Sequence, residues 1–153
     1  VKDHLRLSAI SYLNIRFDMW HDAGRIPKVE EFVKRALKRS HLEEFGDTPV
    51  KNLSYGHQRQ LEIAMTVSMN PKLLLLDEPA AGLSIPEISI VLKVLEELDR
   101  SITIVLIEHD MDLVFEVADE VIVFDHGKLI AQGAPAQIRE NPDVKRIYLG
   151  GQT

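Results

Sequence analysis

Two adjacent acidic residues follow a short apolar run, at a position where carboxylates could take part in a reaction. The run is Leu73 to Leu76, and the acids are Asp77 and Glu78. Because successive side chains of an extended chain point in opposite directions, the two carboxylates can do different things. One can bind a metal ion while the other orients a water molecule, as phosphoryl transfer requires. The alternative is a strand that ends in two solvated acids, and these residues alone leave the two interpretations even.

A polar turn further upstream is a candidate anion site. Ser54 can cap a helix that is predicted to run to Met69, and Gly56 lets a ligand approach the backbone closely. The free N–H groups of the first helical turn would then point towards an anion. An ordinary capped helix uses the same residue types, so the turn by itself favours the structural interpretation.

Parallel strands are expected to position the acids. The leucine run is bounded by helix breakers, which predicts a strand buried on both faces. Ser84 to Glu87 has the pattern of a capping box that starts a helix, and the β-branched run Thr103 to Ile107 predicts the next strand. A strand, helix, strand crossover makes the two strands parallel. Ligands of such sheets bind beyond the carboxyl ends of the strands.

His109 follows the second predicted strand, at the same end as the acids follow the first. The crossover therefore predicts that its imidazole lies on one rim of the sheet with Asp77 and Glu78. The alternative is a polar histidine at the start of a helix that Asp110 caps, and without further context this alternative is favoured.

The remaining pattern is mostly helical before residue 70 and mixed after it. Apolar periodicity predicts helices over residues 1–20 and 29–40, and breakers predict loops over 21–27 and 41–52, the latter with a short helix. His126-Gly127 is a two-residue hairpin signal, with His126 as a solvated turn residue.

Composition describes a globular chain with few options for partners. The 153 residues are 45% hydrophobic and 27% charged, with a net charge of −6 and no cysteine. No basic run reaches the five or so residues that would indicate nucleic-acid binding. The lack of cysteine excludes disulfides and thiolate metal sites and agrees with a cytosolic protein. No apolar stretch approaches the ~20 residues of a membrane span, so a membrane role would be peripheral.

Together these motifs resemble the ATPase subunit of ABC transporters. LSYGH at 53–57 is similar to the family's signature, and LLLLDEP at 73–79 to its Walker B strand with the catalytic glutamate. AAGLS at 80–84 resembles the D-loop, and IEHDM at 107–111 the H-loop. The matching order and spacing make chance agreement about 1% or less.

The resemblance implies an α/β fold, part of the P-loop NTPase fold. It implies a helical subdomain with the signature over residues 1–69 and the C-terminal part of a RecA-like, mainly parallel core over 70–153. Its cofactors would be ATP and Mg²⁺. Two modules would close head to tail, each signature covering the phosphate held by the other module. The implied residue roles are nucleotide contact at Ser54, Tyr55, Gly56 and His57, Mg²⁺ binding at Asp77, water polarisation at Glu78 and γ-phosphate contact at His109.

Several features depart from the family pattern. His57 replaces the usual glutamine, and Gln60 stands where arginine is common. The Walker A motif G-x-x-x-x-G-K-[ST] is absent, and so is the Q-loop, since no glutamine precedes Gln58. Because the first residue is Val1 and not methionine, we expect a C-terminal piece of a longer protein. Such a piece should not bind or hydrolyse ATP by itself, and should be marginally stable or oligomeric.

Weaker cues point to a subgroup, the importers of branched-chain amino acids. LSYG, LEIA, DEPAAGL and the C-terminal GKLIAQGAPAQI and NPDVKRIYLG resemble that subgroup. The implied partners are a second ABC ATPase subunit and membrane permease subunits, at the cytoplasmic, inner face of the membrane. The family's groove for the permease could include Phe17 and Trp20, although aromatics packed in a helical core explain either residue more simply. One alternative is a non-catalytic fragment that supplies signature and dimer surface to a partner. Another is an ABC ATPase used outside transport, against which the importer-like C-terminus argues.

Overall fold

A computed structural model describes residues 1–15 and 26–149 of the chain. Phe17 and Trp20 lie outside these described residues. The chain divides into two compact units, residues 1–106 and 107–153, and each is described by itself. The division expected between residues 69 and 70 stays a prediction.

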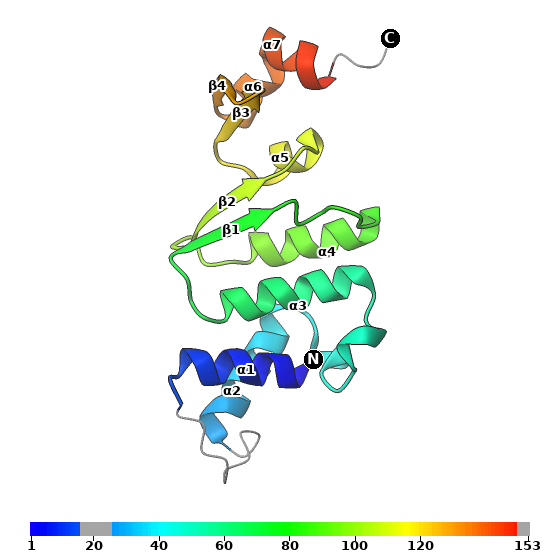
Figure 1. Cartoon of the computed structure of the whole chain (residues 1–153), viewed down its shortest axis with the longest axis vertical. Coiled ribbons are helices and arrows are strands. Elements are labelled where there is room, and N and C mark those ends of the chain that lie inside the picture. The colour runs from blue at the N-terminus through cyan, green and yellow to red at the C-terminus, as the bar shows by residue number, and fades with distance from the viewer. Residues whose placement is uncertain (16–25, 150–153) are drawn as a thin grey trace. The chain divides into compact units, whose positions relative to one another are not determined.

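The first unit is mainly helical, with two strands near its end (Figure 1). Its elements are α1 (Lys2–Tyr12), α2 (Pro27–Arg39), two 3₁₀ turns (Glu43–Phe45 and Val50–Asn52), α3 (Tyr55–Val67), β1 (Leu73–Asp77), α4 (Ile85–Glu96) and β2 (Thr103–Ile107), whose last residue is the first of the second unit. The short helix predicted within residues 41–52 is thus a pair of 3₁₀ turns. The helix predicted from residue 1 to 20 ends at Tyr12, because Asn14 adopts a left-handed φ of 49° that closes the last turn.

Helix α3 lies between two hydrophobic clusters. One is helical and packs residues of α1 and α2 against Leu61 and Ala64 of α3. The other packs Ile63 and Val67, also from α3, against β1 and α4. Since α3 begins at the turn singled out above, this arrangement fixes that turn to the body of the unit.

Strands β1 and β2 are hydrogen-bonded neighbours, and their arrows point the same way in Figure 1. The prediction that β1 is buried on both faces is wrong. Leu74 is 2% exposed, but Leu75 is 68% exposed and Leu73 also faces outward. Helices α3 and α4 cover only one face of the strand, so side chains alternate between core and surface.

The second unit contains α5 (Met111–Val117), β3 (Val121–Asp125), β4 (Lys128–Gly133), α6 (Pro135–Glu140), α7 (Pro142–Val144) and a π-helical turn (Lys145–Leu149). The predicted hairpin is confirmed, because β3 and β4 pair antiparallel with Asp125 opposite Lys128. Its turn residues His126 and Gly127 have φ values of 46° and 75°, and the His126 side chain is 93% exposed. A small core of Val121, Val123, Ile138 and Val144 holds the hairpin against α6 and α7.

Candidate functional site

The turn at residues 53–57, called the signature turn below, leads into α3, and its predicted cap at Ser54 is confirmed. Ser54 has extended backbone angles, and its Oγ accepts a hydrogen bond from the His57 N–H at 3.3 Å. The His57 ring turns back on the same turn, with Nδ1 3.1 Å from Ser54 Oγ. It also packs on Phe45, with ring centroids 4.2 Å apart. The imidazole is therefore held by the protein at both its face and its edge.

Gly56 is buried, and its N–H group contacts a residue that is distant in the sequence. Its N–H donates to Glu87 Oε1 at 3.0 Å, from the first turn of α3 to the first turn of α4. A Cβ on Gly56 would lie 2.6 Å from Glu87 Cγ, so only glycine fits. The expectation that the first-turn N–H groups are free is wrong for Gly56 and His57, because Glu87 and Ser54 already accept from them.

The capping box predicted at Ser84 and Glu87 is confirmed. Glu87 Oε2 accepts from the Ser84 N–H at 3.0 Å and from the Ser84 hydroxyl at 2.7 Å. These hydrogen bonds, the Ser84 hydroxyl first, then the Ser84 and Gly56 N–H groups and the Ser54 hydroxyl, lower the pKa of the Glu87 carboxyl from 4.5 to about 2. The carboxylate is therefore ionised at neutral pH.

The D-loop segment lies against the signature turn. Gly82 has a left-handed φ of 74°, and its Cα faces Tyr55, whose ring would be 3.5 Å from a Cβ at that position. Tyr55 is otherwise exposed. Gly82 of the D-loop segment, residues 80–84, therefore lies beside Tyr55 in the first turn of α3.

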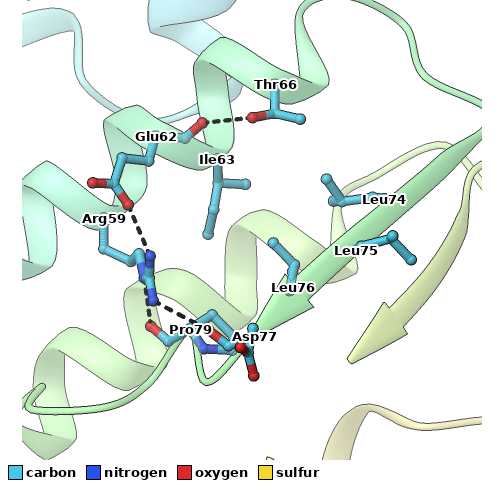
Figure 2. A pocket seen from close by; sticks show the side chains of 9 residues that line it. All are labelled: Arg59, Glu62, Ile63, Thr66, Leu74, Leu75, Leu76, Asp77 and Pro79. Carbon is cyan, nitrogen blue, oxygen red and sulfur yellow. Dashed lines mark hydrogen bonds and ion pairs between the residues drawn. The ribbon is translucent and has the colours of Figure 1, made fainter. Parts of the chain in front are cut away.

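The acidic end of β1 is fixed through its backbone by Arg59 of α3. The guanidinium donates to the carbonyl oxygens of Pro79 at 3.1 Å and Glu78 at 3.0 Å, and it lies 3.5 Å from that of Asp77. Glu62 accepts from the same guanidinium at 2.8 Å. Figure 2 shows Arg59 reaching from α3 to the strand end. The Asp77 and Glu78 side chains themselves are exposed.

Glu78 has a left-handed backbone, with φ of 43°. Such a conformation is costly for a residue with a side chain and persists only where neighbouring contacts impose it. Arg59 supplies such contacts on both sides of Glu78. Beside this turn, a pocket of about 290 Å³ is lined by Arg59, Glu62, Ile63, Thr66, Leu74, Leu75, Leu76, Asp77 and Pro79.

Asp77 fits the role of one ligand to a Mg²⁺ ion that is carried by phosphates. Its exposed carboxylate stands at the carboxyl end of β1. Mg²⁺ commonly takes one or two carboxylates and completes its shell with phosphate oxygens and water. Within residues 1–15 and 26–149, no group of three or more His, Cys, Asp or Glu side chains could hold a metal ion by itself.

His109 belongs to the second unit, where it follows β2 and is exposed. The predicted cap after it is confirmed, since Asp110 Oδ1 accepts from the Asp112 and Leu113 N–H groups at 3.0 and 3.2 Å. The predicted meeting of His109 with Asp77 and Glu78 stays a prediction.

Gln60, the second departure from the family pattern, is a core residue and not part of the turn's surface. It is 1% exposed, and its Nε2 donates to the Ser40 carbonyl at the end of α2. Gln60 Oε1 has no hydrogen-bond partner within the described part of the chain. Likewise, none of the described helices is long and apolar enough to cross a membrane.

Sequence reasoning missed Arg59 and the second role of Glu87. The capping box located Glu87, but its contact with Gly56 spans 31 positions and needs α3 and α4 side by side. Arg59 carries no local signal, because its targets are carbonyl oxygens about 20 positions away. Both contacts are tertiary and appear only once the helices and β1 are packed.

Comparison with known proteins shows the family to which the chain belongs. Residues 4–81 match the family described as ABC transporter, and residues 128–152 match the family described as branched-chain amino acid ATP-binding cassette transporter. The chain is 42% identical over 122 residues to the high-affinity branched-chain amino acid transport ATP-binding protein BraF of Pseudomonas aeruginosa, covering 78% of this chain and 48% of BraF. It is 47% identical over 116 residues to the protein of the same description, LivG, of Escherichia coli, covering 74% of this chain and 46% of LivG.

A solved structure is similar over most of the described fold. It is cbiO1 from Clostridium perfringens, described as part of the ABC transporter complex cbiONQ. It matches with a TM-score of 0.71 and 33% identity over 91% of this chain and 53% of cbiO1. The chain spans about half the length of the curated relatives it matches. The chain belongs to the ABC transporter family of ATP-binding proteins, in its branched-chain amino acid subgroup.

Proposed function

We propose that this chain is the part of an ABC importer's ATP-binding subunit that carries the signature turn and the catalytic acids. The solute would be a branched-chain amino acid or a related small molecule. The observation that carries the proposal is the double use of α3. Ser54 caps its start and Gly56 lies in its first turn, and one turn later its Arg59 holds the backbone of Asp77 and Glu78.

The proposed roles follow from residue type and position. Asp77 would bind the Mg²⁺ of MgATP, which offsets charge on the phosphoryl group. Glu78 would polarise the attacking water, and its imposed backbone conformation would set the direction in which the side chain leaves the backbone. His109 would contact the γ-phosphate. On the nucleotide of a second module, Ser54, Tyr55, Gly56 and His57 would form the covering surface.

Partners and place follow from the same proposal. A second ABC ATPase subunit would complete each site, and membrane permease subunits would receive the motion, with the protein at the cytoplasmic face of the membrane. The 153 residues contain no G-x-x-x-x-G-K-[ST] motif. Most phosphate contacts of a P-loop site come from that loop, so this chain by itself should not bind or turn over ATP.

A chimera tests the proposal. The C-terminal part of LivG that aligns with this chain is replaced by residues 1–153, which keeps the relative's own N-terminal part. We expect the chimera to release phosphate from MgATP, Glu78→Gln to bind ATP without turnover, and Glu96→Gln on the exposed side of α4 to behave as the parent.

Turnover in Glu78→Gln at the parent rate would refute the role of Glu78. A chimera that folds and binds ATP but never hydrolyses it would favour the alternative, a non-catalytic piece that supplies signature and dimer surface. The absence of the phosphate-binding motif from these 153 residues is the observation that keeps this alternative in view.

A further inference from the structure

The carboxylate of Glu87 joins the first turns of two helices. Oε1 accepts from the Gly56 N–H of α3 at 3.0 Å, and Oε2 accepts from the Ser84 N–H and hydroxyl at the start of α4. The N-terminus of a helix attracts anions, because its first N–H groups lack partners within the helix and carry partial positive charge. Glu87 therefore sits where the signature turn would receive an anion from outside.

Both Gly56 and Glu87 are sterically constrained in this contact. Gly56 is buried, and a side chain there would collide with Glu87 at 2.6 Å to Cγ, 2.7 Å to Cβ and 2.8 Å to Oε1. The Cβ and Cγ atoms lie close to the backbone of α4, so the glutamate could not simply swing its far end away. Glycine at position 56 thus leaves the room that the Glu87 carboxylate of the same chain needs to reach the backbone.

Capping the start of a helix does not by itself require a charged side chain such as that of Glu87. The chain builds a comparable box at α6, where the Ala134 N–H donates to Gln137 Oε1 at 3.0 Å. There a neutral amide satisfies the helix start, and the box stays within one helix. At α4 the corresponding residue is an ionised carboxylate that also reaches Gly56, 31 positions away.

We propose that Glu87 is an internal substitute for phosphate: it occupies the signature turn in the resting chain and has to leave Gly56 before a nucleotide phosphate can bind there. This rests on the proposed function, in which Ser54 and Gly56 contact a phosphate. Because Glu87 also caps α4 at Ser84, its release changes the start of α4 and the D-loop before it. Phosphate arrival at α3 is thereby coupled to the D-loop.

The mechanism is competition between two anions for one donor. A phosphate has more charge and more acceptor oxygens than a carboxylate, but Glu87 is held in place by Ser84 and is present in every molecule. Removing the Glu87 charge should therefore raise the apparent affinity of the turn for phosphate. Removing a carboxylate elsewhere on α4 should not.

The test is a titration of the ¹⁵N-labelled chain with inorganic phosphate at pH 7 and constant ionic strength, following the Tyr55 and Gly56 amide resonances by NMR. The variants are Glu87→Gln, which keeps a capping side chain like that of Gln137, and the control Glu96→Gln. We expect Glu87→Gln to saturate at a phosphate concentration about tenfold lower than the parent or more. Glu96→Gln should match the parent.

Glu87→Asp is the second variant, and it carries the test if Glu87→Gln does not fold. It keeps the charge but is one methylene too short to span from α4 to Gly56, so it should respond as Glu87→Gln does. If the parent and both variants reach half-saturation at the same phosphate concentration, the competition is overturned, while phosphate binding at the turn is not. No response at Gly56 in any folded variant would also overturn the competition, because Glu87 would then exclude no phosphate from the turn; the contact across the dimer is tested separately by mixing chimeras. Amides of α1 and α2 report whether each variant is folded.

Discussion

Arg59 should contribute strongly to the stability of the first unit, and Arg59→Met isolates that contribution. Methionine keeps the length and apolar stem of the side chain but removes every donor. The substitution leaves the carbonyl oxygens of Glu78 and Pro79 without the guanidinium that now reaches them at 3.0 and 3.1 Å. The turn after β1 would lose the contacts that hold the left-handed backbone of Glu78.

The expected magnitude follows from the contacts. A hydrogen bond to a charged donor contributes about 1.5–3 kcal/mol. Two such bonds set an upper range, which is lowered because the Arg59 side chain is 28% exposed and water can replace part of the interaction. The partner Glu62 is 64% exposed and adds little. We therefore expect Arg59→Met to lose about 2–3 kcal/mol of unfolding free energy, and Arg59→Lys about half as much, since one ammonium cannot bridge the same carbonyls.

Urea unfolding followed by circular dichroism measures this free energy. The matched control is Arg35→Met on α2, because Arg35 is 69% exposed and its ion pair with Glu31 is 4.0 Å long. The control should stay within about 0.5 kcal/mol of the parent. An Arg59→Met chain as stable as the control would refute the claim that Arg59 fixes the end of β1.

Three further outcomes are expected. The stability difference between the parent and Glu87→Gln should be constant above pH 4.5 and shrink as pH falls towards about 2, because the folded pKa lies below the ordinary one; a difference that persists below pH 2 in urea titrations would contradict this. Gly56→Ala should cost about 1–3 kcal/mol, since its Cβ meets Glu87 at 2.6 Å, and the cost should fall in a Glu87→Ala background; equal costs in both backgrounds would exclude the clash. In the LivG chimera, His109→Ala should lower phosphate release by about 10²-fold or more while His126→Ala changes little, because His126 is a solvated turn residue. Similar losses at the two histidines would argue against the site.

The sequence was sufficient to predict features that depend only on neighbouring residues. The serine cap of α3, the capping box at Ser84 and the hairpin at His126-Gly127 depend on residues a few positions apart, and all three are confirmed. The family motifs were likewise readable, because each is a short run with a fixed order.

Sequence was insufficient where one element meets another. A run of four leucines cannot say whether one or both faces of β1 are covered, and here only one is. The same holds for the first-turn N–H of Gly56, whose acceptor comes from another helix. Arg59 differs from other surface cations only through the three carbonyls it meets at the end of β1.

The central claim is that the signature turn of one module and the acids of another form a common site, and one mixing measurement tests it most directly. Two LivG chimeras are prepared, one with Gly56→Asp and one with Glu78→Gln, each expected to be inactive alone. In a mixed head-to-tail dimer, the intact acids of the first chimera face the intact signature of the second. Random mixing of equal amounts should restore about a quarter of the parent's phosphate release. A mixture that stays as inactive as its two components would contradict the account.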